Sequence, residues 1–193
     1  LHLCDRRQRQ MCKETATKLA AYSKDVVYEE GKSGKAVRLG DYGLKLDEEN
    51  LGKEYTVSAW VKPDGTLAEN QNVLFLGYHN PEKWLAVSGK KTGTNTCKIW
   101  ENGNGYKWST FWSPEIDTEG WHNITLSGKS GQVTAYVDGI KLGTHDSNDP
   151  LDGENQGIYL GVTNWDAEFE GLVDEVNVYD IALTEKEVQE QNK

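Results

Sequence analysis

The sequence is poor in cysteine and in basic residues, and it lacks long apolar runs. Its three cysteines, Cys4, Cys12 and Cys97, show no CxxC spacing, which argues against a zinc site; a Cys4–Cys12 disulfide stays open. Lys and Arg number 21 against 31 Asp and Glu, and the net charge of −10 argues against nucleic-acid binding. No segment approaches the roughly 20 apolar residues that cross a bilayer. Residues 1–10 also lack a signal-peptide core, so we expect a chain without membrane insertion.

Common catalytic motifs are also missing from the sequence. The four histidines, at positions 2, 79, 122 and 145, show no metal-ligand spacing, and no GxSxG elbow presents a nucleophilic serine. No DxDxDG run of the EF-hand type occurs either. Asn123-Ile-Thr125 fits the glycosylation pattern, but its position in a predicted strand makes the match incidental. The sequence therefore gives little support to nucleophilic hydrolysis.

The residues that are abundant point to an all-β protein. There is one Met, but there are 20 Gly, seven Trp and nine Tyr, a balance typical of aromatic-rich strands joined by turns. Short strand-like runs are separated by Gly, Asn, Asp and Pro. They are 36–39, 55–62, 72–78, 84–87, 97–101, 121–126, 133–137, 158–162 and 173–179. About ten strands at this spacing predict a two-sheet antiparallel β-sandwich that forms a single domain.

Three local patterns are specific enough to predict particular structures. In residues 55–62, Tyr, Val, Ala and Val alternate with Thr, Ser, Trp and Lys, so the first set should face the core. Asp138-Gly139 is the dipeptide favoured in a two-residue hairpin turn. Thr184 and Glu187 form a capping box, which predicts a short C-terminal helix.

Residues 1–18 differ from the rest of the chain, because they are polar and lack period-two alternation. We assign them to a linker, a processing remnant or an extension added for expression. Residues 19–193 then form the folded domain.

Four blocks of sequence together form a recognisable pattern: GKSGKAVRL from Gly31, YTVSAWVKP from Tyr55, GWHNITL from Gly120 leading to AYVDG, and GLVDEVNVYDIALT from Gly171. In their order and spacing, these blocks resemble the laminin G-like, concanavalin A-like jelly-roll superfamily. Similar modules are appended to bacterial secreted glycoside hydrolases and adhesins. The resemblance implies a jelly roll, a secreted or cell-surface bacterial location, often a structural calcium ion, and often carbohydrate binding beside a separate catalytic domain. It also implies a monomeric module within a larger chain.

An aromatic-rich segment supplies the candidate ligand-binding residues. Sugars present apolar C–H faces to aromatic rings and hydroxyls to amide and charged groups, so a sugar site needs both kinds of side chain. The segment from 78 to 112 mixes them, and its turn-rich part, 101–108, should form an exposed hairpin tip. Trp60 and Trp121 lie in the blocks above and are assigned to structure. The candidate ligand-binding residues are Trp84, Trp100, Asn102, Tyr106, Trp108, Trp112 and Trp165.

The resemblance also places a calcium ligand at Asp174. Calcium prefers six to eight oxygen ligands from carboxylates and carbonyls. The remaining ligands would come from the loop of Glu30, Gly31 and Ser33. The alternative is that Asp174 is a hydrogen-bonded carboxylate at a strand end.

Two other functions remain open from the sequence. Glu115-Ile-Asp-Thr-Glu119 resembles the Glu-x-Asp-x-Glu strand motif of retaining glucanases, in which alternate carboxylates supply the nucleophile and the acid. Pro114 before it and Gly120 after it suggest a connecting loop instead, so we do not expect an enzyme. The other alternative is a structural or protein-binding laminin G-like domain whose aromatic residues are buried.

Overall fold

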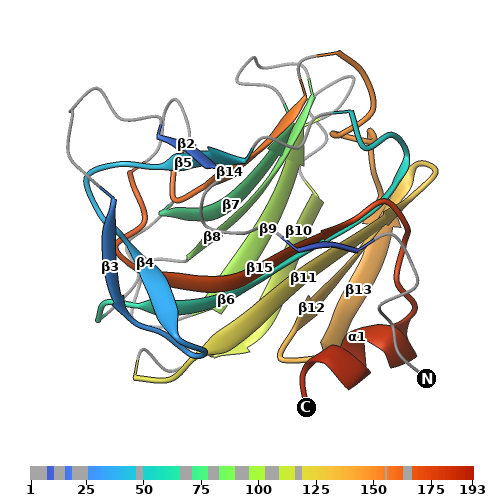
Figure 1. Ribbon diagram of the computed structural model, residues 1–193. Coiled ribbons are helices and arrows are strands. Elements are labelled where there is room, and N and C mark those ends of the chain that lie inside the picture. Colours follow the sequence, from blue (N-terminus) through green and yellow to red (C-terminus); the bar gives the residue numbers. More distant parts are fainter. Residues whose placement is uncertain are drawn as a thin grey trace.

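The computed structural model describes residues 8–10, 16–18, 26–46, 50–65, 71–77, 83–89, 96–102, 109–115, 119–154, 156–162 and 167–193. Two antiparallel sheets pack face to face, and helix α1 (Glu185–Gln191) follows the last strand beside the lower sheet in Figure 1. The all-β sandwich predicted from the sequence is therefore confirmed. Within the described residues, no helix is long and apolar enough to span a membrane.

Each sheet is built from strands that are distant in the sequence. The eight-stranded sheet runs β13 (Ile140–Asp146), β12 (Gln132–Val137), β11 (His122–Lys129), β6 (Glu54–Pro63), β15 (Gly171–Tyr179), β4 (Lys35–Leu39) and β3 (Val27–Glu30), with β1 (Gln8–Gln10) paired to β15. The seven-stranded sheet runs β10 (Ser109–Glu115), β9 (Thr96–Asn102), β8 (Trp84–Gly89), β7 (Asn72–Gly77), β14 (Gly157–Leu160), β5 (Leu44–Leu46) and β2 (Ala16–Lys18).

The strands that the sequence predicted are all present, but some observed strands were not predicted. β3 and β5 have four and three residues, too few to show alternation. β10 contains Pro114, which argues against a strand because proline cannot donate to the ladder. Its place at the edge of the seven-stranded sheet explains why the proline is tolerated.

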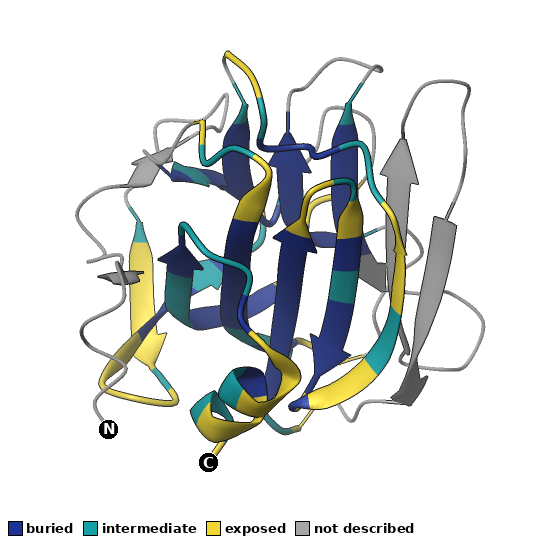
Figure 2. Cartoon of the chain, turned by 90° about the vertical axis from the view of Figure 1, so that its right-hand side faces the viewer, coloured by how far each residue is buried: buried dark blue, intermediate teal, exposed yellow. Residues whose placement is uncertain are grey.

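The hydrophobic core lies between the two sheets. On β6, Tyr55, Val57, Ala59 and Val61 are at most 1% exposed and face this core, as the alternation predicted. The seven-stranded sheet contributes the alternate residues of its strands, such as Leu74 and Leu76 on β7. Figure 2 shows buried strands through the middle of the molecule and exposed residues on β3 and on the outer surface of α1.

The predicted hairpin and helix cap are also present. Asp138 and Gly139 both have positive φ angles, 51° and 74°, as a two-residue turn of the favoured type requires. At the start of α1, the Glu187 N–H donates to Thr184 Oγ1 and the Thr184 N–H donates to Glu187 Oε2. Val188 anchors the helix in a small cluster with Tyr136, Tyr179 and Leu183.

Two short strands fall inside residues 1–18, the segment that the sequence assigned to a linker or an added extension. β1 pairs with β15, and β2 pairs with β5. The structure therefore places parts of this segment against both sheets. Its origin, and the domain boundary at residue 19, stay predictions.

Candidate functional site

A second layer of aromatic side chains lies on the outer face of the seven-stranded sheet. Phe75, Trp84, Ala86 and Tyr159 form a cluster separate from the main core. They alternate along their strands with core residues such as Leu74 and Leu85, so they lie on the opposite side of the sheet. The Phe75 ring is stacked on Trp84 and meets Tyr159 edge to face, with centroids 5.9 Å apart in both pairs.

Strand register extends this face onto β9 and β10. Directly opposite residues of an antiparallel pair share a face of the sheet. Trp100 is opposite Ala86, Asn102 is opposite Trp84, and Trp112 is opposite Lys98, which is itself opposite Ser88. Four of the sequence-predicted positions therefore belong to one face, which we call the aromatic face: Trp84, Trp100, Asn102 and Trp112.

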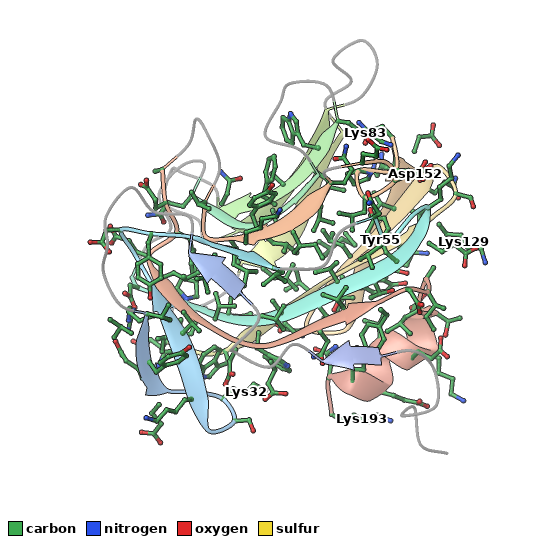
Figure 3. The ribbon with its side chains drawn as sticks, turned by 45° about the horizontal axis from the view of Figure 1, so that its top comes forward. Lys32, Tyr55, Lys83, Lys129, Asp152 and Lys193 are labelled. Atoms are coloured by element: carbon green, nitrogen blue, oxygen red, sulfur yellow. The ribbon has the colours of Figure 1, made fainter. Side chains whose placement is uncertain are left out.

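The start of β8 is fixed by close backbone contacts. Lys83, directly before Trp84, donates from Nζ to the carbonyl oxygen of Asp152 at 2.6 Å, and the two residues lie beside each other in Figure 3. Gly77, opposite Trp84, has a φ of 108°, and a Cβ there would lie 2.5 Å from the Lys83 carbonyl oxygen. A side chain at position 77 would therefore displace the strand that carries Trp84.

Burial separates the aromatic residues of this face by role. Trp84 and Tyr159 are each 5% exposed and Phe75 is fully buried, so these rings pack on one another and have little surface for a ligand. They can instead support neighbouring positions of the same face. Sequence reasoning missed Phe75 and Tyr159, because every residue of β7 and β14 is buried and no polar alternation marks an outer face.

The remaining aromatic predictions divide into two groups. Tyr106, Trp108 and Trp165 lie outside the described residues, as does much of the predicted hairpin tip. Trp60 and Trp121, assigned to structure from the sequence, are both half-buried. Trp60 lies on the outer face of the other sheet, where the Lys32 ammonium is 3.6 Å from its ring centroid.

The predicted calcium ligands come together only in part. Asp174 is 3% exposed; its Oδ2 accepts from the Ser33 N–H at 3.0 Å and its Oδ1 from the Glu175 N–H at 2.9 Å. Gly31 lies against the same carboxylate, since a Cβ there would be 2.3 Å from Oδ2. Glu30 is an exposed residue at the end of β3.

These contacts fit the hydrogen-bonded carboxylate that the sequence left as the alternative. In the described part of the chain, no three Asp, Glu, His or Cys side chains gather in a possible metal site. A calcium ion beside Asp174 would therefore depend on backbone carbonyls and water for most of its ligands. The calcium site stays a prediction.

The two candidate glucanase carboxylates do not share a described strand. β10 ends at Glu115, opposite Thr96 and after a register shift. Glu119 is an exposed residue in a bend that precedes β11. The retaining mechanism would need both carboxylates on alternate positions of one strand. Among the described residues, Glu115 and Glu119 do not have this arrangement.

A charge cluster of the described residues lies on the eight-stranded sheet, whereas the aromatic face belongs to the seven-stranded sheet. Arg38 on β4 bonds Glu29 through two nitrogens, at 2.7 and 2.9 Å, and also contacts Asp64. The hydrogen bond from Arg38 lowers the pKa of Glu29, and the same bond raises the pKa of Arg38. These groups are a satisfied surface network rather than a reactive site.

Comparison with known proteins places this geometry in a family. A laminin G family model, described as the concanavalin A-like lectin/glucanases superfamily, matches residues 38–189. Comparison with curated proteins gives no significant match. Domain 4 of an extracellular GH43 arabinanase from Geobacillus stearothermophilus, solved in complex with arabinotriose, is 28% identical, with a TM-score of 0.77 over 92% of this chain and 88% of that chain.

More distant structures share the fold alone. A pentraxin from Limulus polyphemus is 16% identical, with a TM-score of 0.57 over 74% of this chain and 70% of its own. Tailspike protein 2 of bacteriophage CBA120 is also 16% identical, with a TM-score of 0.74 over 95% of this chain but 31% of its own. Because the family match spans most of the sequence and the sandwich agrees with it, the chain belongs to the concanavalin A-like lectin/glucanases superfamily.

Proposed function

We propose that this domain is a non-catalytic carbohydrate-binding module, and that its ligand is an arabinan-type oligosaccharide. The observation that carries the proposal is the strand register that puts Trp84, Trp100, Asn102 and Trp112 on one face of the seven-stranded sheet. The similar arabinanase domain, which is in complex with arabinotriose, supports the choice of ligand.

The residues of the aromatic face divide into a supporting layer and a binding layer in this proposal. Phe75, Trp84 and Tyr159 form a rigid base, since they are buried and in mutual ring contact. We assign sugar stacking to Trp100 and Trp112, and hydrogen bonding to Asn102. Stacking gains free energy from the apolar face of the sugar, and the amide fixes its orientation. A single such site binds weakly, with a dissociation constant of roughly micromolar to millimolar.

Calorimetric titration with arabinotriose tests the proposal, with xylotriose and cellotriose as comparison ligands. We expect saturable binding of arabinotriose, at least tenfold weaker in Trp100→Ala or Trp112→Ala. Trp60→Ala is the matched control, because it removes a tryptophan from the outer face of the other sheet. Absence of binding to arabinotriose and arabinan would reject this ligand. Equal effects of all three substitutions would reject the aromatic face.

The proposal also includes the parent protein, its location and the oligomeric state of the domain. A module of this kind works within a larger extracellular bacterial protein and as a monomer, which sedimentation of the purified domain checks. The glucanase alternative has its own assay. We expect no release of reducing ends from β-glucan, and release that Glu115→Gln abolishes would show that the domain is an enzyme.

A further inference from the structure

A groove of about 390 Å³ lies on the outer face of the eight-stranded sheet, on the other side of the core from the aromatic face. β11, β12 and β13 form its floor, and residues 182–185, which lead into α1, form one wall. This volume falls in the range of small-ligand sites. The proposed carbohydrate site does not use it.

The wall of the groove is fixed by buried hydrogen bonds. The Thr56 hydroxyl donates to the Ile181 carbonyl at 2.8 Å and accepts from the Leu183 N–H at 2.9 Å. The Ser127 hydroxyl donates to the Leu183 carbonyl at 2.9 Å. Val188, fully buried, holds the following helix against the sheet. The groove is therefore a built feature with one rigid side.

The polar side chains of the groove are two lysines, several hydroxyls and an amide that both donate and accept, and one carboxylate, Glu185. Thr134 and Thr144 face each other across β12 and β13 with hydroxyl oxygens 2.8 Å apart. Lys129 is well exposed and its Nζ lies 3.7 Å from Glu54. In the described part of the chain, the Lys141 ammonium and the Gln132 amide have no hydrogen-bond or ion-pair partner. An ammonium group has three donors and cannot accept, so Lys141 favours an acceptor-rich or anionic ligand, whereas the Gln132 amide can both donate to and accept from a sugar hydroxyl.

We infer that this groove is a second carbohydrate site, specific for a sugar that carries a carboxylate, a uronic acid. One carboxylate of an oligouronate binds Lys141 and another binds Lys129 by charge-assisted hydrogen bonds, because the two lysines lie at opposite ends of the groove: Lys141 is opposite Tyr136, whereas Lys129 follows the residue opposite Val133. The threonine hydroxyls and Gln132 hydrogen-bond the sugar hydroxyls between them. Glu185, on the wall, accepts from sugar hydroxyls. On a chain of net charge −10, binding of an anion depends on such local donors rather than on the overall field.

The test compares two ligands that differ at the carboxyl group, which is charged in the acid and neutral in the methyl ester. Trigalacturonate and its methyl ester are titrated into the intact protein by calorimetry or NMR. We expect the acid to bind and the ester to bind about tenfold more weakly. Lys141→Gln should weaken binding of the acid about tenfold and Lys129→Gln about threefold, because each removes a charged donor. Lys35→Gln, an exposed lysine at the far end of the same sheet, is the matched control.

The outcomes are distinct from those of the aromatic face. Arabinotriose binding should be unchanged in Lys141→Gln, and trigalacturonate binding should be unchanged in Trp100→Ala. The proposal for the groove and the proposal for the aromatic face can therefore be rejected independently. The inference is overturned if the intact protein does not bind trigalacturonate. It is also overturned if acid and ester bind equally, or if Lys141→Gln behaves like Lys35→Gln.

Discussion

Replacing Trp84 by alanine should destabilise the domain strongly, although the sequence marks this residue as a ligand contact. Trp84 is 5% exposed and stacks on Phe75 at 5.9 Å. Burial of about 200 Å² of aromatic surface at ~25 cal/mol/Å² contributes about 5 kcal/mol, an upper estimate because unfolded chains already bury part of it. Tryptophan-to-alanine changes in cores cost about 3–5 kcal/mol, and we expect a loss in this range.

Trp60→Ala supplies the comparison on the opposite sheet. Trp60 is half-buried, and its contact with the Lys32 ammonium is worth about 0.5–1 kcal/mol. With the partial loss of packing, we expect its removal to cost about 1–2 kcal/mol. The two variants therefore differ by at least about 1 kcal/mol if burial decides the cost.

Urea unfolding followed by far-ultraviolet circular dichroism measures both variants without relying on tryptophan fluorescence. The midpoint for Trp84→Ala should fall well below that for Trp60→Ala, with similar slopes. A cost for Trp84→Ala of less than about 1 kcal/mol would refute the supporting role. In that case Trp84 would be reconsidered as a ligand-contacting ring.

Three further predictions concern the helix cap, the buried carboxylate and two buried phenols. Thr184→Ala should lower stability by about 1 kcal/mol in thermal melts by removing the capping box, and an unchanged melting temperature would contradict the role of that cap. If calcium binds beside Asp174, excess chelator should lower the melting temperature of the wild type but not that of Asp174→Asn; no shift and no bound metal would leave only the hydrogen-bonded carboxylate. Burial raises the pKa values of Tyr136 and Tyr179, so stability should be full below about pH 10 and fall as the pH rises through the raised pKa values. Tyr179→Phe should reduce this alkaline loss in unfolding curves measured against pH, and an identical loss in the variant would contradict the assignment.

The sequence indicated the aromatic face but not the groove on the eight-stranded sheet. The aromatic residues clustered along 78–112 marked one candidate surface directly, because sugars and aromatic rings have complementary surfaces. Lys129, Lys141 and the threonine pair come from three strands and carry no motif. Only the pairing of β11 with β12 and of β12 with β13 brings them together.

Local patterns determined much of the fold. The alternation in 55–62, the turn at Asp138-Gly139 and the capping box at Thr184 depend on neighbours within a few residues, so the sequence alone predicted them. The four family-like blocks similarly predicted the sandwich. β10 was missed because Pro114 is acceptable only at a sheet edge, and edge position is a tertiary property.

The tertiary structure decided which side of β8 faces the core and which distant residues share a face with Trp84. Period-two alternation groups Trp84 with Ala86, but it does not tell whether that group is inside, outside or covered. The pairing of β8 with β7, and of β7 with β14, brought Phe75 and Tyr159 to Trp84 and buried all three. The sequence identified candidate ligand-binding residues. Because burial depends on long-range packing, only the fold could divide these residues into a buried supporting layer and a proposed binding layer.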